Sequence, residues 1–283
     1  MLLRKGIALA AALGLMVSAG TALAAGGAKP VKHIEYSFEG PLGKFDQAQL
    51  QRGYKVYREV CAACHSMNLM SFRNLGQKGG PFYDEHHPNP NDNPYVKAIA
   101  AEVQINDIDT ETGDVIQRAG TSADKFPAPF PNEPAARASN GGALPPDLSV
   151  ITKARHHGPQ YVYSLLTGYS APPDGLAMTE TQHYNPYFPG DLTPFWSKSH
   201  DTVPPGGFIA MAPPLKDGLV TFDDGTPSTL KNQARDVAAF LTWASEPKLE
   251  ERKQFGMAAM IYLVLMTGLL WFSYKRIWRN VAH

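Results

Sequence analysis

Two cysteines and the histidine after them carry the strongest chemical signal in the chain. Cys61, Cys64 and His65 have the spacing C-x-x-C-H, which is the attachment motif of a c-type haem. In that chemistry the two thiols add to the haem vinyl groups, and the adjacent histidine ligates the iron. The spacing matters because both sulfurs must reach opposite edges of one porphyrin while His65 points at its centre. We therefore predict one covalently bound haem c, with its iron ligated by His65 on the proximal side.

Two other kinds of site share the C-x-x-C spacing. A thioredoxin-like redox pair needs no following histidine and usually lies near a βαβ pattern, whereas the residues before Cys61 look helical. A structural zinc site would need two further ligands. Since the chain has no other cysteine, only the histidine pairs 86–87 or 156–157 could supply them. We keep both sites as alternatives to haem attachment.

The occupant of the sixth iron position decides whether a haem carries electrons or reacts with small molecules. A thioether there raises the reduction potential and blocks small ligands. Among the nine methionines, five lie in the apolar segments at the two ends, and two follow His65 too closely to reach the opposite haem face. Met178 and Met211 remain. Met211 lies in the segment 208–214, where two prolines would stiffen its loop, and we favour it as the distal ligand.

The haem motif must be positioned by the helix that precedes it. Asp46, with Gln49 three residues later, has the pattern of a capping box. Apolar and aromatic residues then recur on one helix face, at Leu50, Tyr54 and Tyr57. The predicted helix runs directly into Cys61, so its last turn fixes where the motif begins.

The rest of the chain before its apolar C-terminal segment combines a few helices with long loops. Start signals and apolar periodicity predict helices over 93–103, 159–167 and 228–244. Residues 103–119 place an acidic turn between β-branched residues, which predicts either a hairpin or a solvated loop. The Pro- and Gly-rich segments 126–147 and 174–214 are typical of loops. The second is so long that we expect it to be functional or disordered.

Composition limits the class of protein. The chain has 283 residues with 26 basic and 26 acidic side chains, a length that allows one large or two small domains. The balanced charge argues against a nucleic-acid binder, and two cysteines exclude a disulfide-dense scaffold. The content of 25 glycines and 24 prolines indicates many loops.

The two ends of the chain are apolar. Residues 1–24 hold two basic residues, an apolar stretch and an A-x-A site, which predicts a secretory signal peptide rather than an N-terminal anchor. Residues 254–274 are almost wholly apolar and would form about 30 Å of helix, which predicts a transmembrane helix rather than a buried core helix. The positive-inside rule then puts the basic tail 275–283 in the cytoplasm. Residues 25–253 would form a periplasmic haem domain.

Several longer motifs together point to a known family. The chain contains, in this order, CAACHSM at 61–67, GALPPDLS at 142–149, KARHHGPQYVYSLLTGY at 153–169, NPYFPG at 185–190, IAMAPPL at 209–215, FDDGTP at 222–227 and WASEP at 243–247. On these segments it resembles the cytochrome c1 family, the haem subunit of the bacterial cytochrome bc1 complex (ubiquinol–cytochrome c oxidoreductase). The resemblance implies a mainly α fold: a class I cytochrome c-like haem domain enlarged by long loops and a small β hairpin, plus one C-terminal transmembrane helix.

The resemblance also assigns roles to residues of this chain. Cys61 and Cys64 would hold the haem covalently, with His65 as the proximal iron ligand. Met211 would be the distal ligand, and Arg155 matches the position that pairs with a haem propionate, for which a guanidinium is well suited. Three further residues would line the haem crevice: Asn140, Pro146 and Tyr161.

The function implied by the resemblance is electron transfer in a respiratory or photosynthetic chain. The haem would take one electron from the Rieske iron–sulfur protein, after quinol oxidation at cytochrome b, and pass it to a cytochrome c. The subunit would not be an enzyme by itself, and the complex would be a dimer in the bacterial inner membrane. Two other classes stay open: a free-standing membrane-anchored c-type electron shuttle, and a haem enzyme or gas sensor with an open sixth site.

Charge suggests where an electron acceptor would dock. Without the five basic residues of the two ends (Arg4, Lys5, Lys275, Arg276 and Arg279), 21 basic side chains face 26 acidic ones, a balance of −5. Docking of a basic cytochrome c would be electrostatic. The candidate acidic contacts are Asp107, Asp109, Glu111, Asp114, Asp223 and Asp224. For any single one of them, a solvated surface carboxylate is the stronger reading.

Two features depart from the family pattern. Some bacterial relatives carry an extra cysteine pair that forms a disulfide near the distal ligand, and this chain has no such pair. The segment Asp191–Pro205 is an insertion close in sequence to Met211. We hypothesise that packing of Phe195 and Trp196 supports the distal loop in place of a disulfide.

Overall fold

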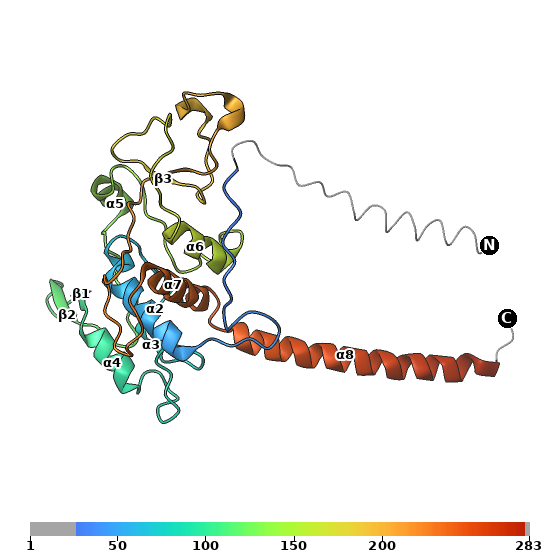
Figure 1. Cartoon of the computed structure of the whole chain (residues 1–283). Coiled ribbons are helices and arrows are strands. Elements are labelled where there is room, and N and C mark those ends of the chain that lie inside the picture. Colours follow the sequence, from blue (N-terminus) through green and yellow to red (C-terminus); the bar gives the residue numbers. More distant parts are fainter. Residues whose placement is uncertain (1–26, 281–283) are drawn as a thin grey trace.

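The computed structural model describes residues 27–280, so the predicted signal peptide lies outside the described residues. The helices and strands are α2 (Gln47–Glu59), η1 (Cys61–Ala63), α3 (Phe72–Leu75), α4 (Pro94–Ala101), β1 (Gln104–Ile108), β2 (Val115–Ala119), α5 (Glu133–Ser139), α6 (Gly158–Leu166), β3 (His183–Asn185), η2 (Thr193–Phe195), η3 (His200–Thr202), β4 (Gly207–Ile209), α7 (Leu230–Ser245), α8 (Leu249–Ile277) and η4 (Trp278–Asn280). The chain forms a largely helical domain from which α8 projects as one long helix (Figure 1).

The core is built where α2 crosses α7, and α7 packs in turn against α6. Gly53 allows the close crossing, because a Cβ there would lie 2.1 Å from the carbonyl oxygen of Asp236. The rings of Tyr54 and Tyr57 on α2 lie 5.6 and 5.8 Å from that of Phe240 on α7. This aromatic contact fixes the C-terminal half of α2, and with it the haem motif.

The start of α2 confirms half of the predicted capping box. The Asp46 carboxylate accepts the backbone N–H of Gln49 at 3.2 Å, as an N-cap residue should. The Gln49 side chain does not reach back to the cap, because it donates to the buried carboxylate of Asp236 at 2.9 Å. The helix ends at Glu59 and η1 begins at Cys61, so α2 leads into the motif as predicted.

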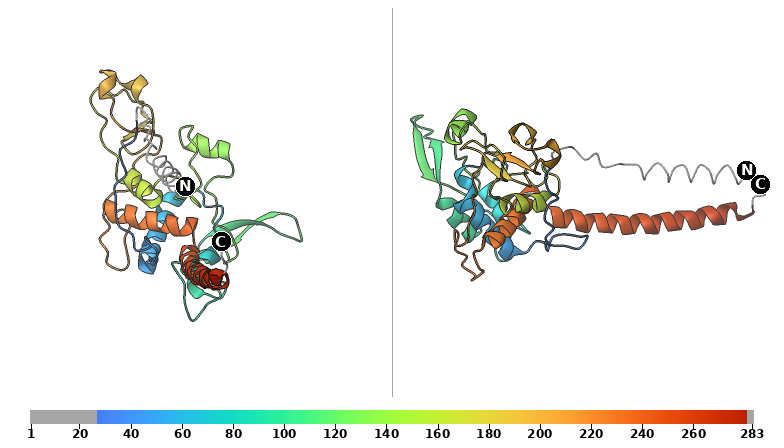
Figure 2. Two further views of the ribbon diagram at one scale, coloured as in Figure 1. Left: turned by 90° about the vertical axis from the view of Figure 1, so that its right-hand side faces the viewer. Right: turned by 45° about the horizontal axis from the view of Figure 1, so that its top comes forward.

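The other predicted helices are confirmed as α4, α6 and α7, each with ends close to those expected. Residues 104–108 and 115–119 pair as an antiparallel hairpin, not as a loop, and this hairpin projects from the side of the domain away from α8 (Figure 2). The loop prediction for 126–147 is wrong in part, because it contains α5. The Asn132 side chain caps that helix by accepting the N–H of Ala135 at 2.9 Å.

The long segment 174–214 holds a second two-stranded sheet, β3–β4, which the prediction of a single hairpin missed. Tyr184 pairs with Phe208, and the antiparallel register runs from His183 with Ile209 to Asn185 with Gly207. Each strand has three residues, too short for an alternating pattern to show in the sequence. Together with η2 and η3 the sheet forms a lobe above α6 (Figures 1 and 2).

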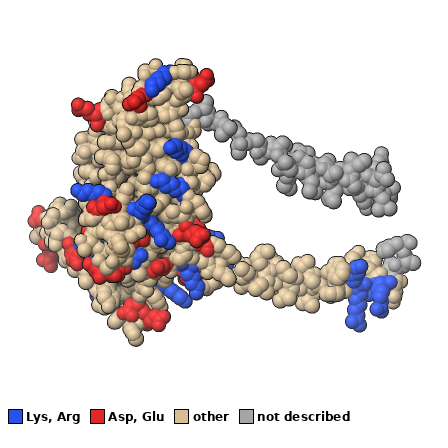
Figure 3. Space-filling view, in the orientation of Figure 1, with Lys and Arg blue, Asp and Glu red and all other residues tan. Residues whose placement is uncertain are grey.

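Helix α8 is long and apolar enough to cross a membrane, and its most apolar window is not buried against the rest of the structure. It therefore fits the predicted transmembrane helix and not a buried core helix. Basic side chains gather at its far end (Figure 3). Its first turns are tied to the domain, since Lys253 donates to the carbonyl of Phe38 at 2.5 Å and Glu250 accepts the N–H of Phe45 at 2.8 Å.

Candidate functional site

The haem motif is folded as a tight turn at the end of α2. The backbone N–H groups of Cys64 and His65 both donate to the carbonyl of Cys61, at 3.1 and 2.9 Å. Both cysteines are free thiols, the first half-buried and the second exposed. Burial raises the pKa of Cys61 to about 12, whereas a reactive redox cysteine needs a lowered pKa.

His65 is oriented for metal ligation. Its Nδ1 lies 2.8 Å from the carbonyl oxygen of Pro146, and since a carbonyl can only accept, Nδ1 carries the proton and Nε2 keeps its lone pair. Such a hydrogen bond to the second ring nitrogen is typical of ligating histidines. Burial lowers the pKa of His65, which favours the neutral ring. The structure thus brings two of the predicted site residues, His65 and Pro146, together.

Asp147 fastens this contact in place. Its carboxylate accepts the hydroxyl of Ser66, the N–H of Asn68 and the N–H of Ser149, each at 2.8 Å. These hydrogen bonds join the segment that holds Pro146 to the residues after His65. Sequence reasoning missed Asp147, although an Asp two residues before a Ser is a common turn signal.

Met211 lies just after β4 and is half-buried. Its carbonyl oxygen accepts the hydroxyl of Tyr169 at 2.9 Å. The insertion reaches the strand before it, because the ring of Phe195 packs edge-on against Phe208 with centroids 5.3 Å apart. The indole of Trp196 instead donates to the Ser199 carbonyl and the Thr202 hydroxyl within the insertion itself. Phe195 therefore contacts the distal strand, while Trp196 holds its own loop.

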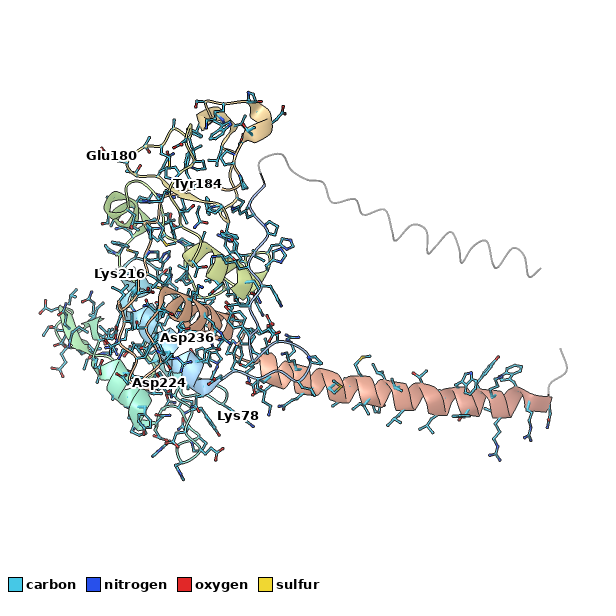
Figure 4. The ribbon with its side chains drawn as sticks, viewed as in Figure 1. Lys78, Glu180, Tyr184, Lys216, Asp224 and Asp236 are labelled. Carbon is cyan, nitrogen blue, oxygen red and sulfur yellow. The ribbon has the colours of Figure 1, made fainter. Side chains whose placement is uncertain are left out.

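The other methionines differ in their surroundings. Met67 and Met70 are buried in the core, so their side chains pack in the hydrophobic interior. Met178 is half-buried and lines a pocket of about 310 Å³ with Tyr169 and Pro213. Both remaining candidates for the distal ligand are thus close to Tyr169, in the lobe where Figure 4 labels Tyr184.

Arg155 and Tyr161 lie together, whereas the side-chain hydrogen bond of Asn140 is within its own helix. The phenol of Tyr161 lies close enough to the exposed guanidinium of Arg155 and to Tyr169 to interact electrostatically with both. Arg155 also donates to the carbonyl of Ala154 at 3.0 Å. Asn140, at the end of α5, donates from its side chain to the Ala136 carbonyl at 2.7 Å. Arg155 and Tyr161 therefore lie near Tyr169, which binds the Met211 carbonyl. The Asn140 side chain instead caps its own helix.

The donor set as a whole suits a haem c. Two free thiols, an imidazole Nε2 and a thioether are the groups that tether such a haem and ligate its iron. Comparison with known proteins decides the family, because residues 36–281 match the Cytochrome C1 family. The chain belongs to the cytochrome c1 family. Since cytochromes are haem proteins, the prediction of a haem cofactor is confirmed.

Relatives of the chain occur in bacteria and in plants, among other organisms. The chain is 38% identical over 95% of its length to cytochrome c1 of Rhodospirillum rubrum and covers 97% of that protein. It is 42% identical over 84% of its length to "Cytochrome c1-2, heme protein, mitochondrial" of Solanum tuberosum and covers 80% of it. A protein of Bradyrhizobium diazoefficiens named cytochrome b/c1 is 41% identical over 87% of this chain, which spans only 35% of that protein.

Two further expectations can be compared with the structure of this cytochrome c1. Within residues 27–280, no group of three or more His, Cys, Asp and Glu side chains could hold a metal ion, so the zinc alternative lacks its ligands. Three of the acidic docking candidates form ion pairs with basic residues of the same chain: Asp107 with Arg118, Asp223 with Lys55 and Asp224 with Arg52. Glu111 and Asp114, at the turn of the hairpin, are exposed.

Proposed function

We propose that this cytochrome c1 is the haem-bearing electron-transfer subunit of a cytochrome bc1 complex. It would receive one electron from the Rieske iron–sulfur protein and pass it to a cytochrome c. The observation that carries the proposal is the C-x-x-C-H turn in which Pro146 binds Nδ1 of His65 at 2.8 Å and leaves Nε2 for iron. A haem held there supplies one-electron chemistry as its iron changes between the ferric and ferrous states.

The residues of the chain hold and tune that group. Cys61 and Cys64 would tether the haem, and His65 and Met211 would ligate its iron. A methionine ligand suits electron transfer because it raises the potential and blocks small ligands. Arg155 would pair with a propionate, as a guanidinium does with a carboxylate. The proposed lining of the crevice comprises Asn140, Pro146 and Tyr161.

The proposed fold is a class I cytochrome c-like haem domain, and the proposed partners are cytochrome b, the Rieske protein and a cytochrome c, in a dimeric complex. A relative whose name joins cytochrome b with c1 supports association with cytochrome b. The exposed acidic residues at the hairpin turn, Glu111 and Asp114, support electrostatic docking of a basic cytochrome c.

The proposed location is the bacterial inner membrane, with the haem domain in the periplasm. Residues 1–24 would be removed as a signal peptide, and 25–253 would form the periplasmic domain. The span 254–274 would lead to a cytoplasmic tail, 275–283. Haem c attachment to an exported chain and the single apolar helix α8 support this arrangement.

The test replaces each candidate distal ligand in the assembled complex. Met211→Leu should abolish the charge-transfer absorption of Met-ligated ferric haem, lower the reduction potential and reduce quinol–cytochrome c activity at least tenfold, roughly the scale of a lost metal ligand. Met178→Leu is the matched control and should leave all three unchanged. If Met178→Leu gave the loss instead, the ligand assignment would be reversed. Failure of the chain to co-purify with cytochrome b and a Rieske protein would favour the free-standing shuttle.

A further inference from the structure

We propose that Tyr169 is a positioning residue for the distal iron ligand, because its hydroxyl holds the backbone at Met211. The hydroxyl donates to the Met211 carbonyl oxygen at 2.9 Å, across 42 residues of sequence. The inference rests on the proposed function, in which the Met211 sulfur ligates the iron. It adds a residue to which neither the motif nor the family resemblance gave a role.

Tyr169 lies in a closely packed turn at the end of α6. It follows α6 directly after Gly168, where a Cβ would lie 2.4 Å from the ring of Tyr187 and 2.5 Å from the carbonyl of Ser164. The turn is therefore packed too closely to shift without moving its neighbours. The buried side chain of Asn185 on β3 also donates to the carbonyl of Leu165 at 2.8 Å. Helix α6 and strand β3 are thus joined beside Tyr169.

The same frame carries Met211. Strand β3 pairs with β4, and β4 ends at Ile209, two residues before Met211. Tyr169 therefore follows α6 and Met211 follows β4, two elements that are joined to each other through β3. The hydrogen bond from the Tyr169 hydroxyl to the Met211 carbonyl links the two segments directly.

The distal segment has few other ways to be held. Pro213 and Pro214 have no N–H to donate, so two consecutive backbone positions after Met211 offer acceptors only. Within residues 27–280, Tyr169 makes the only side-chain hydrogen bond that reaches the segment 210–215. Loss of its hydroxyl would leave the Met211 carbonyl without that donor and let the loop move.

The experiment compares two tyrosine hydroxyls of the same lobe in the full bc1 complex. Tyr169→Phe removes the bond to Met211. Tyr184→Phe is the matched control, since it removes a hydroxyl that donates at 2.7 Å to the carbonyl of Pro205. Ferric haem is titrated with base, and loss of the Met charge-transfer absorption is recorded per covalently attached haem, so a lower yield of complex does not affect the result.

Tyr169→Phe should keep Met ligation at neutral pH but lose it at about fivefold lower hydroxide concentration, a downward shift of about 0.7 pH unit, which is the typical worth of one hydrogen bond. Tyr184→Phe should titrate like the wild type. An unchanged midpoint in Tyr169→Phe, or an equal shift in both variants, would overturn the positioning role.

These outcomes are distinct from failure of the proposed function. If the wild-type haem lacks the Met absorption, or keeps it in Met211→Leu, then Met211 is not the ligand, and the role of Tyr169 falls together with that assignment. If the absorption is present in the wild type and is lost in Met211→Leu, the ligand assignment stands. An unshifted Tyr169→Phe midpoint then rejects the role of Tyr169 alone.

Discussion

At the residue scale, the two sides of the proposed haem site are held by different means. On the proximal side one carboxylate, Asp147, gathers three donors at 2.8 Å and so fixes the segment that carries Pro146 against His65. On the distal side a phenol, Tyr169, gives one neutral bond to the Met211 carbonyl. Hydrogen bonds to a charged group are the stronger kind. The geometry therefore makes the histidine side the more firmly fixed of the two.

This difference predicts the effect of Asp147→Ala. The variant leaves two backbone N–H groups and the Ser66 hydroxyl without their acceptor, which should lower the free energy of unfolding by about 2 kcal/mol. It should also reduce the share of chain that carries covalent haem, since His65 loses its fixed orientation. Unfolding by guanidinium, followed by haem absorption, and haem staining of the purified chain measure both effects.

Asp174→Ala is the control for this prediction, because Asp174 is an exposed carboxylate on the loop after α6. It should change neither stability nor haem content by a measurable amount. Equal behaviour of the two variants would contradict the role given to Asp147.

The residues of the site differ in how well they can be identified from the sequence alone. Cys61, Cys64 and His65 lie within five positions, so their spacing alone states the chemistry. For the distal ligand the residues left Met178 and Met211, with Met211 favoured, because the choice depends on contacts between distant segments. Tyr169 lies 42 residues from the carbonyl that it binds, and no local sequence pattern predicts a hydrogen bond between such distant residues.

At the element scale, the crossing of α2 with α7 sets the position of the haem motif. The two helices approach closely at Gly53, which has no side chain to separate them. The motif begins two residues after the end of α2, so a shift of this crossing moves both cysteines. A change in the packing of this crossing would therefore change the position of the residues proposed to tether the haem.

Gly53→Ala tests this link. The added methyl would lie 2.1 Å from the Asp236 carbonyl oxygen and 2.7 Å from Cβ of Phe240, so the helices must separate. Overpacking of this kind should cost about 3 kcal/mol of folding free energy and lower the covalent haem content. Gly256→Ala, on α8, adds the same methyl where no atom lies within 4 Å, and should have little effect. Unchanged stability of Gly53→Ala would show that the crossing can adjust.

Sequence patterns predicted the elements that carry long signals and missed the short ones. Helices α2, α4 and α7 have side-chain N-caps, and α6 has a proline in its first turn. All four have apolar periodicity and form where expected. Helix α5 was hidden in a Pro-rich segment, because its seven residues are too few to show a period clearly. Strands β3 and β4 pair across a 21-residue insertion-bearing loop (186–206), and such pairing depends on tertiary contacts rather than on propensity.

At the scale of the whole molecule, charge is distributed unevenly along the chain. Taken together, the 283 residues are neutral, but three basic residues follow the apolar part of α8 at its far end, namely Lys275, Arg276 and Arg279. Acidic residues lie on the domain at the other end of that helix (Figure 3). This asymmetry predicts a preferred orientation in a membrane.

The tail should therefore lie in the cytoplasm, because basic residues beside a span are retained on that side. A green fluorescent protein fused after His283 should fluoresce, since it folds in the cytoplasm, whereas alkaline phosphatase fused at the same point should be inactive. Phosphatase fused after Lys253, before the span, should be active. The reverse pattern would contradict the orientation. Because Lys253 and Glu250 bind residues 38–45 of the domain, the side of the membrane reached by the tail also fixes the side of the haem.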